Sequence, residues 1–257
     1  MKILLSCILI ALALSTGARG ALITLGACAD NTLYADPLGS LSNAQGPTFF
    51  AGQTGGNSTR RGFIRFDLAA IPDGAQIDSV TLSLYLAQAL SFPTAVTLHR
   101  TLQAWGEGTS ATGFRGGGGA TSTTGDATWL HTFYSGSLWT NPGGDFATAA
   151  SASTLVGAEG STYTWGSTPL LIADAQGWIA NRSSNFGWLL QGDETQGGTA
   201  KAFGTHEIAS LAQRPALTVE YHIAAVPEPA TACTGLALGL VVFGRALGRR
   251  RSRQPAA

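Results

Sequence analysis

Strict alternation of apolar and polar residues is the feature that most constrains the fold of this chain. Residues 79–86 read Ser-Val-Thr-Leu-Ser-Leu-Tyr-Leu, so that every second side chain is apolar. Residues 217–221, Leu-Thr-Val-Glu-Tyr, repeat the pattern. A period of two is that of a β-strand with one buried and one exposed face. These segments therefore predict a β-protein whose strands each cover one side of a core.

Further segments with strand character are short and separated by glycine-rich turns. They are 22–25, 32–35, 48–51, 62–68, 96–102, 127–130, 163–165, 186–191 and 201–206, whereas 106–126 and 147–160 are expected to be loops. One helix is expected, because Thr168 suits an N-cap, Pro169 suits the first turn, and apolar residues recur at helical spacing until Asn181. We predict an all-β, jelly-roll-like β-sandwich of about 9–11 strands with one short helix.

The first twenty residues have the pattern of a secretory signal peptide. Lys2 precedes an apolar run from Ile3 to Leu14, and Ala18 and Gly20 are small enough for signal peptidase. The run is shorter than the ~20 residues that a spanning helix needs. We expect a signal helix over 1–20 and an exported domain over 21–225. A lipoprotein cleavage site at Leu-Gly-Ala-Cys, residues 25–28, is the alternative.

Residues 226–257 combine three features in a fixed order: a Pro-Glu-Pro motif, an apolar stretch over 230–243 and an arginine cluster. The motif and cluster include Pro227, Glu228, Pro229, Arg249, Arg250 and Arg251. Cations after an apolar helix are typical of a stop-transfer segment. The series resembles the PEP-CTERM sorting signal of Gram-negative bacteria, which implies a transient transmembrane helix, processing by an exosortase, and display on the cell surface or in the extracellular matrix. An ordinary membrane anchor is the alternative.

Charge separates the domain from the two ends of the chain. The ends hold 7 of the 15 basic residues, which leaves 8 basic and 14 acidic side chains between residues 21 and 225. An acidic domain lacks the basic surface that binds nucleic acid, so DNA and RNA are excluded as partners. Cys28 is the single cysteine of the domain, which excludes a disulfide bond within it.

Motifs for catalysis are missing from the sequence. The four histidines, His99, His131, His206 and His222, lack the spacing of an H-E-x-x-H metal site, and no Gly-x-Ser-x-Gly elbow is present. His206 and Glu207 would point to opposite faces of a strand, so we expect no acid–base pair from them. The sequence predicts a protein that is not an enzyme. A hydrolase or lyase is the less favoured alternative, because two strands could bring carboxylates together.

All six tryptophans lie between residues 105 and 188. Flat aromatic faces can stack on sugar rings while polar neighbours bond the hydroxyl groups. Trp178 and Trp188 are expected in the core. The candidates for an exposed sugar-binding platform are Trp105, Trp129, Tyr134 and Trp139. Filling of the core by these rings is the alternative.

The most specific motif of the domain is Arg-Gly-Phe-Ile-Arg-Phe-Asp-Leu at 61–68, followed by Ile-Pro at 71–72 and the strand at 80–85. With Trp-Gly-Glu at 105–107 and Arg-Pro-Ala-Leu at 214–217, the series resembles the DNRLRE, or disaggregatase-related, domains, which are classed with carbohydrate-binding modules. The resemblance covers residues 30–221 and implies a secreted jelly-roll sandwich that binds polysaccharide. The six-letter string that names the family is absent from this chain.

In such a sandwich Arg65 and Asp67 share one face of a strand, and we expect them to form a structural ion pair, with a ligand-gripping pair as the alternative. Related sandwiches often hold calcium, so a structural calcium ion is left open. Oxygen ligands near strand ends are Asp30, Asn31, Asp36 and Asp145.

The sequence thus predicts a secreted or cell-surface polysaccharide-binding module without chemistry of its own. A structural protein of the envelope or extracellular matrix, with no specific sugar site, is the alternative.

Overall fold

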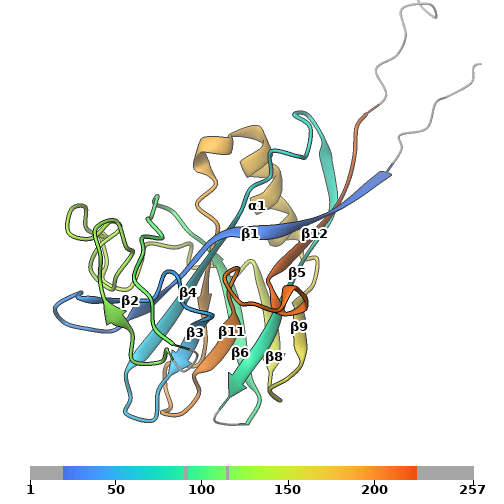
Figure 1. Cartoon of the computed structure of the whole chain (residues 1–257). Helices are drawn as coiled ribbons and strands as arrows, with labels where there is room; N and C mark the ends of the chain where they lie inside the picture. Colours follow the sequence, from blue (N-terminus) through green and yellow to red (C-terminus); the bar gives the residue numbers. More distant parts are fainter. Residues whose placement is uncertain (1–19, 90–91, 114–115, 225–257) are drawn as a thin grey trace, which may run out of the picture. The chain divides into compact units, whose positions relative to one another are not determined.

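The computed structural model describes residues 20–89, 92–113 and 116–224 (Figure 1). The predicted signal helix and the predicted C-terminal apolar helix, with its Pro-Glu-Pro motif and arginine cluster, lie outside these residues. Within them, no helix has the length and apolar character needed to cross a membrane. The described residues up to Ile223 form one compact unit.

The described chain contains twelve strands, one α-helix and two short 3-10 helices. The strands are β1 (Gly20–Tyr34), β2 (Leu41–Ser42), β3 (Thr48–Gln53), β4 (Thr59–Phe66), β5 (Gln76–Ala89), β6 (Thr94–Arg100), β7 (Ala120–Thr121), β8 (Ala152–Val156), β9 (Thr162–Trp165), β10 (Trp188–Gln191), β11 (Lys201–Gly204) and β12 (Ala216–His222). The helices are α1 (Pro169–Ala180), η1 (Arg182–Ser184) and η2 (Leu211–Gln213). The predicted all-β sandwich with one helix is confirmed.

Ten of the twelve strands form an antiparallel sheet that folds over into two facing layers, and β2 and β7 pair in a separate two-stranded sheet (Figure 1). The order of the large sheet is β1-β12-β5-β11-β3-β4-β10-β6-β8, and β9 pairs with β5. The first half of β1 pairs with β12 and the second half with β4, with a shift of register between Ala27 and Ala29. A bulge of this kind bends and twists a strand. It allows β1 to run from one layer into the other.

The main core lies between the two layers. The apolar residues predicted to be buried in the strand at 79–86 are fully buried in β5. Helix α1 covers one end of this core with Leu171, Ala175, Trp178 and Ile179. The helix begins as predicted, because the Thr168 hydroxyl accepts a hydrogen bond from the Leu171 N–H at 3.1 Å.

A second, smaller core covers the outer face of the layer that contains β4. Strand alternation turns Ile64 and Phe66 toward the main core and Phe63 away from it. Phe63 is nevertheless fully buried, because the long connection between β6 and β8 folds back over it. Residues of that connection, including Trp105 and Trp139, pack on Phe63 together with Leu33 and Leu189 of the sheet.

Three of the segments predicted from the sequence differ in the structure, and one of them, the predicted loop over 106–126, contains the two-residue strand β7. Residues 127–130, a predicted strand, are irregular with a bend at 129–130, and Ala127 and Trp129 pack on the second core. Residues 147–160, a predicted loop, contain β8. In β8 a leucine, Leu155, lies 66% exposed on the outer face while Thr154 lies between the two buried residues Ala152 and Val156. The sequence of β8 therefore lacks the alternation of apolar and polar residues that predicts a strand.

Candidate functional site

A groove of about 480 Å³ lies where the long connection between β6 and β8 meets the outer face of the sheet. Two of its lining residues lie opposite each other on adjacent strands, Gln191 of β10 and Arg61 of β4. Its lining residues are Arg61, His99, Leu102, Asn141, Pro142, Gly144, Asp145, Phe146, Thr148 and Gln191. The groove therefore combines rings and apolar groups with amide, carboxylate and guanidinium side chains.

Arg61 is held rigidly at the side of this groove. Its Nε and Nη2 atoms donate to the two carboxylate oxygens of Glu194 at 2.7 and 2.8 Å, and its Nη1 atom donates to the Gly143 carbonyl at 2.9 Å. The guanidinium carbon lies 5.1 Å from the centre of the Trp129 ring and 5.3 Å from that of Phe146. A bidentate ion pair and two cation–π contacts fix the orientation of the side chain.

Gly143 permits this close approach. Its φ is +89°, and a Cβ atom there would lie 2.6 Å from Nη1 of Arg61 and 2.8 Å from the Trp129 ring. Any other residue at this position would displace the arginine or the indole.

The carboxylate of Asp145 organises the loop on the other side of the groove. It accepts hydrogen bonds from the N–H groups of Thr140 and Asn141 at 2.7 and 3.1 Å, from the Asn141 amide at 2.8 Å and from the Gln103 amide at 2.8 Å. Burial acts to raise the pKa of Asp145, but the hydrogen bonds from Thr140 and Asn141 together hold it below its ordinary value. The ionised carboxylate thus fixes the turn that presents Asn141.

Two of the four aromatic residues predicted to bind sugar are in the second core. Trp105 and Trp139 are 2% and 5% exposed, and both rings stack on Phe63. Their indole N–H groups donate to the carbonyls of Phe186 and Thr128. The prediction that they form an exposed platform is wrong, because the loop that carries them folds inward onto the sheet.

The other two candidates are partly exposed. Trp129 is half-buried beside the groove and contacts Arg61. Tyr134 is also half-buried, and its ring meets that of His131 edge-on at 5.1 Å. Of the four candidates, Trp129 is therefore the one that borders the groove.

The predicted ion pair between Arg65 and Asp67 does not form. The guanidinium of Arg65 lies 5.4 Å from the centre of the Trp105 ring. Asp67 is exposed and accepts a hydrogen bond from the Ala69 N–H at 2.9 Å. The prediction is wrong because β4 ends at Phe66, so Asp67 belongs to the following turn and not to the strand face that carries Arg65.

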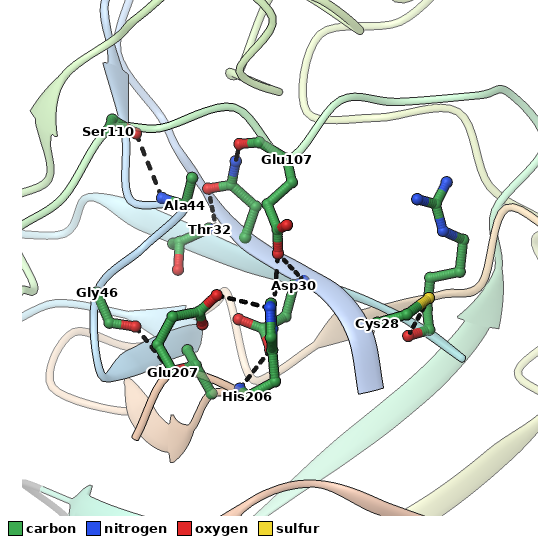
Figure 2. Close-up of polar contacts among 12 residues, drawn as sticks. Cys28, Asp30, Thr32, Ala44, Gly46, Glu107, Ser110, His206 and Glu207 are labelled. Carbon is green, nitrogen blue, oxygen red and sulfur yellow. Dashed lines mark hydrogen bonds and ion pairs between the residues drawn. The ribbon is translucent and has the colours of Figure 1, made fainter. Parts of the chain in front are cut away.

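A second polar site brings together Asp30, Glu107, His206 and Glu207 (Figure 2). Asp30 lies in β1, His206 and Glu207 follow the end of β11, and Glu107 lies in the connection after β6. The Asp30 Oδ2 atom accepts hydrogen bonds from the backbone N–H and from Nδ1 of His206 at 2.9 and 3.0 Å. The Nε2 atom of His206 lies 2.6 Å from Oε1 of Glu207. We name these four residues the acidic–histidine cluster.

Glu107 completes the cluster from the other side. Its Oε1 atom accepts the Asp30 N–H at 2.8 Å and lies 3.6 Å from Nδ1 of His206. Its carbonyl accepts a hydrogen bond from the Asn31 amide at 2.9 Å. These contacts attach the loop after β6 to β1.

Burial dominates the electrostatics of the carboxylates in the cluster. It raises the pKa of Asp30 to about 6 against the opposing effect of the hydrogen bond from His206, and it raises the pKa of Glu107 to about 7. Hydrogen bonds to Asp30 and Glu207 raise the pKa of His206 to about 10. The imidazole is therefore protonated at neutral pH and lies between carboxylates.

The sequence prediction that His206 and Glu207 are poor partners is wrong. Strand β11 ends at Gly204, and the two residues occupy a turn in which their side chains meet.

The four residues considered as calcium ligands, Asp30, Asn31, Asp36 and Asp145, do not form one group. Asp36 bonds Ser40 in its own turn and Asp145 bonds Thr140 and Asn141 in another. The local sequence offers one signal for the cluster, namely an aspartate at 30 within an otherwise uncharged strand.

Comparison of the chain with models of protein families gives no match, and a search of curated proteins gives none either.

Proposed function

We propose that the domain is a non-catalytic polysaccharide-binding module, exported to the cell surface or the extracellular matrix, and that it binds sugar in the groove beside Arg61. The observation that carries the proposal is the composition of this groove: the Phe146 ring lies beside planar polar side chains that include Asn141 and Gln191. A ring can stack on the C–H face of a sugar while an amide bonds neighbouring hydroxyl groups. The sequence resemblance to DNRLRE domains supports the same function.

The charges of the groove favour a neutral polysaccharide. The guanidinium of Arg61 is paired with Glu194, and both nitrogens of His99 are hydrogen-bonded, to the Ala147 carbonyl and to the Thr97 hydroxyl. Each of the cationic or titratable nitrogen groups that line the groove in the described chain is thus already engaged. A uronate carboxylate would have to displace one of these partners.

A protein of the envelope or matrix that binds no sugar is the second candidate. It is favoured by one observation, the burial of five of the six indoles: Trp105, Trp139, Trp165, Trp178 and Trp188. These rings stabilise the fold and are closed to a ligand.

Binding of the purified full-length protein to neutral and acidic polysaccharides, by glycan array and titration calorimetry, distinguishes the two candidates. We expect Gln191→Ala and Asn141→Ala each to weaken binding about 5–10-fold, the effect of losing one hydrogen bond of about 1–1.4 kcal/mol. Gln213→Ala is the matched control, because Gln213 is also half-buried but lies on η2 and does not line the groove. The same incubations should release no reducing ends.

Absence of binding to every polysaccharide would refute the sugar-binding proposal and leave the second candidate. An equal loss of binding in Gln213→Ala and Gln191→Ala would also contradict the assignment of the groove.

A further inference from the structure

We propose that the acidic–histidine cluster binds one divalent transition-metal cation of the Zn²⁺ class. The site is separate from the groove and does not depend on sugar binding. Three of its side chains, Asp30, His206 and Glu207, each offer a ligand atom, and these atoms lie within 4.8 Å of one another. Figure 2 shows the carboxylate groups of Asp30 and Glu207 turned toward the imidazole of His206.

Two oxygen atoms of the cluster have no partner. Oδ1 of Asp30 and Oε2 of Glu207 are shielded from solvent and accept no hydrogen bond, although Asp30 is fully buried. Buried polar atoms are nearly always satisfied, and an exception calls for an explanation such as an ion. A cation held between these carboxylates would satisfy both oxygens.

The excess of negative charge in the cluster also favours binding of a cation. It contains three carboxylates, and in the described chain the one basic group within ion-pair distance of them is the imidazole of His206. Burial makes the surplus of negative charge costly, since buried charges are ordinarily paired or coordinate a metal. A divalent cation would neutralise the negative charge that His206 alone leaves uncompensated.

The donor atoms point to the Zn²⁺ class of cations and not to calcium. An imidazole nitrogen together with carboxylate oxygens suits Zn²⁺ and neighbouring transition metals, whereas Ca²⁺ takes oxygen ligands in larger number. When the cation binds, it takes the place of a proton that lies between His206 and one of its carboxylates. A bond forms between the imidazole nitrogen and the metal, the N–H bond breaks, and the proton leaves to solvent. Asp30 and Glu207 provide the oxygen ligands from the protein.

The cation would join two segments that are distant in sequence, and Glu107 attaches a third segment to Asp30 through its hydrogen bond. His206 is 176 residues from Asp30, and Glu107 is 77 residues from it. Since a ligand that binds the folded state alone stabilises it, Zn²⁺ is expected to raise the melting temperature of the protein.

The test is titration of the EDTA-treated full-length protein with ZnCl₂ at neutral pH, followed calorimetrically, together with the d–d absorption of Co²⁺ added in place of Zn²⁺. We expect one cation per chain and a loss of affinity of at least tenfold in His206→Gln. Glu207→Gln provides a second variant should His206→Gln fail to fold. His222→Gln is the matched control, because His222 pairs with Asp78 at 2.9 Å in a site without a third ligand, and it should bind as the parent does.

Three results would overturn the proposal. The first is the absence of Zn²⁺ and Co²⁺ binding, which would leave the cluster as an ion-pair network. The second is an equal loss of affinity in His222→Gln. The third is Ca²⁺ binding that exceeds Zn²⁺ binding and persists in His206→Gln. Failure of polysaccharide binding would not affect this test, because the two readouts are independent.

Discussion

Replacing Phe63 with alanine should destabilise the domain strongly, and it tests whether the tryptophans of the long loop are structural. Phe63 is fully buried on the outer face of β4. Its ring centre lies 5.0 Å from that of Trp105 and 5.3 Å from that of Trp139, with interplanar angles of 18° and 27°. The three rings form the centre of the second core, so the substitution removes the surface on which both indoles pack.

The expected loss follows from these contacts. Burial of a phenylalanine side chain contributes about 1.5–3 kcal/mol to the free energy of unfolding, and each aromatic pair adds about 0.5–1.5 kcal/mol. The sum agrees with the about 3–5 kcal/mol measured for Phe→Ala changes in other cores. We expect a loss of about 4 kcal/mol. A domain with a stability of about 5–15 kcal/mol remains folded after such a loss.

Urea unfolding, followed by tryptophan fluorescence, measures this loss. With a slope of about 2 kcal/mol per molar urea, the midpoint should fall by about 2 M. Leu155→Ala is the control, because Leu155 is 66% exposed on β8, and its midpoint should move by less than about 0.3 M. A shift below about 0.5 M for Phe63→Ala would refute the second core. It would instead favour loop indoles that are open to a ligand.

Two further predictions concern backbone conformation and pH. Gly187→Ala should lower the free energy of unfolding by more than about 1 kcal/mol, since its φ is +74° and its Cβ would lie 2.1 Å from the Ile64 carbonyl oxygen. Gly26→Ala, with nothing within 4 Å of its Cβ, should change stability by less than about 1 kcal/mol in the same denaturation assay. Burial raises the pKa of Asp174 above 3.8 against hydrogen bonds from Ser151 and Trp188. The folded state therefore binds this proton more tightly than the unfolded state, and the stability of the protein relative to Asp174→Asn should fall as pH rises from about 3 through the raised pKa. A difference that stays constant from pH 3 to 7 would contradict this prediction.

The parts of the fold that the sequence predicted correctly depend on neighbours in the chain. The alternation at 79–86 determines which face of β5 is buried, whatever strand lies beside it. The start of α1 depends on Thr168 and the three residues that follow, since the cap is a bond between Thr168 and Leu171. Both patterns depend only on residues close together in the chain, so they can be read without knowledge of the tertiary structure.

For the site residues that were predicted incorrectly, exposure depends on which other segments of the chain cover them. Trp105 and Trp139 adjoin glycine-rich loops, a context in which exposure is the ordinary expectation, but the loop closes on Phe63. Alternation in β4 shows that Phe63 points away from the main core. It cannot show that another segment supplies a second core there, because that packing joins residues distant in the chain.

The sequence by itself determined the fold class, the position of the helix and the strands that carry regular alternation, because period and capping are properties of short segments. Only the tertiary structure decided which polar groups meet. Asp30 and His206 are 176 residues apart, and they come together because β1 crosses from one layer to the other beside the turn after β11. The groove at Arg61 likewise exists because a loop from β6 packs on β4 and β10. Burial and the convergence of charges are set by such long-range packing, and no local pattern encodes them.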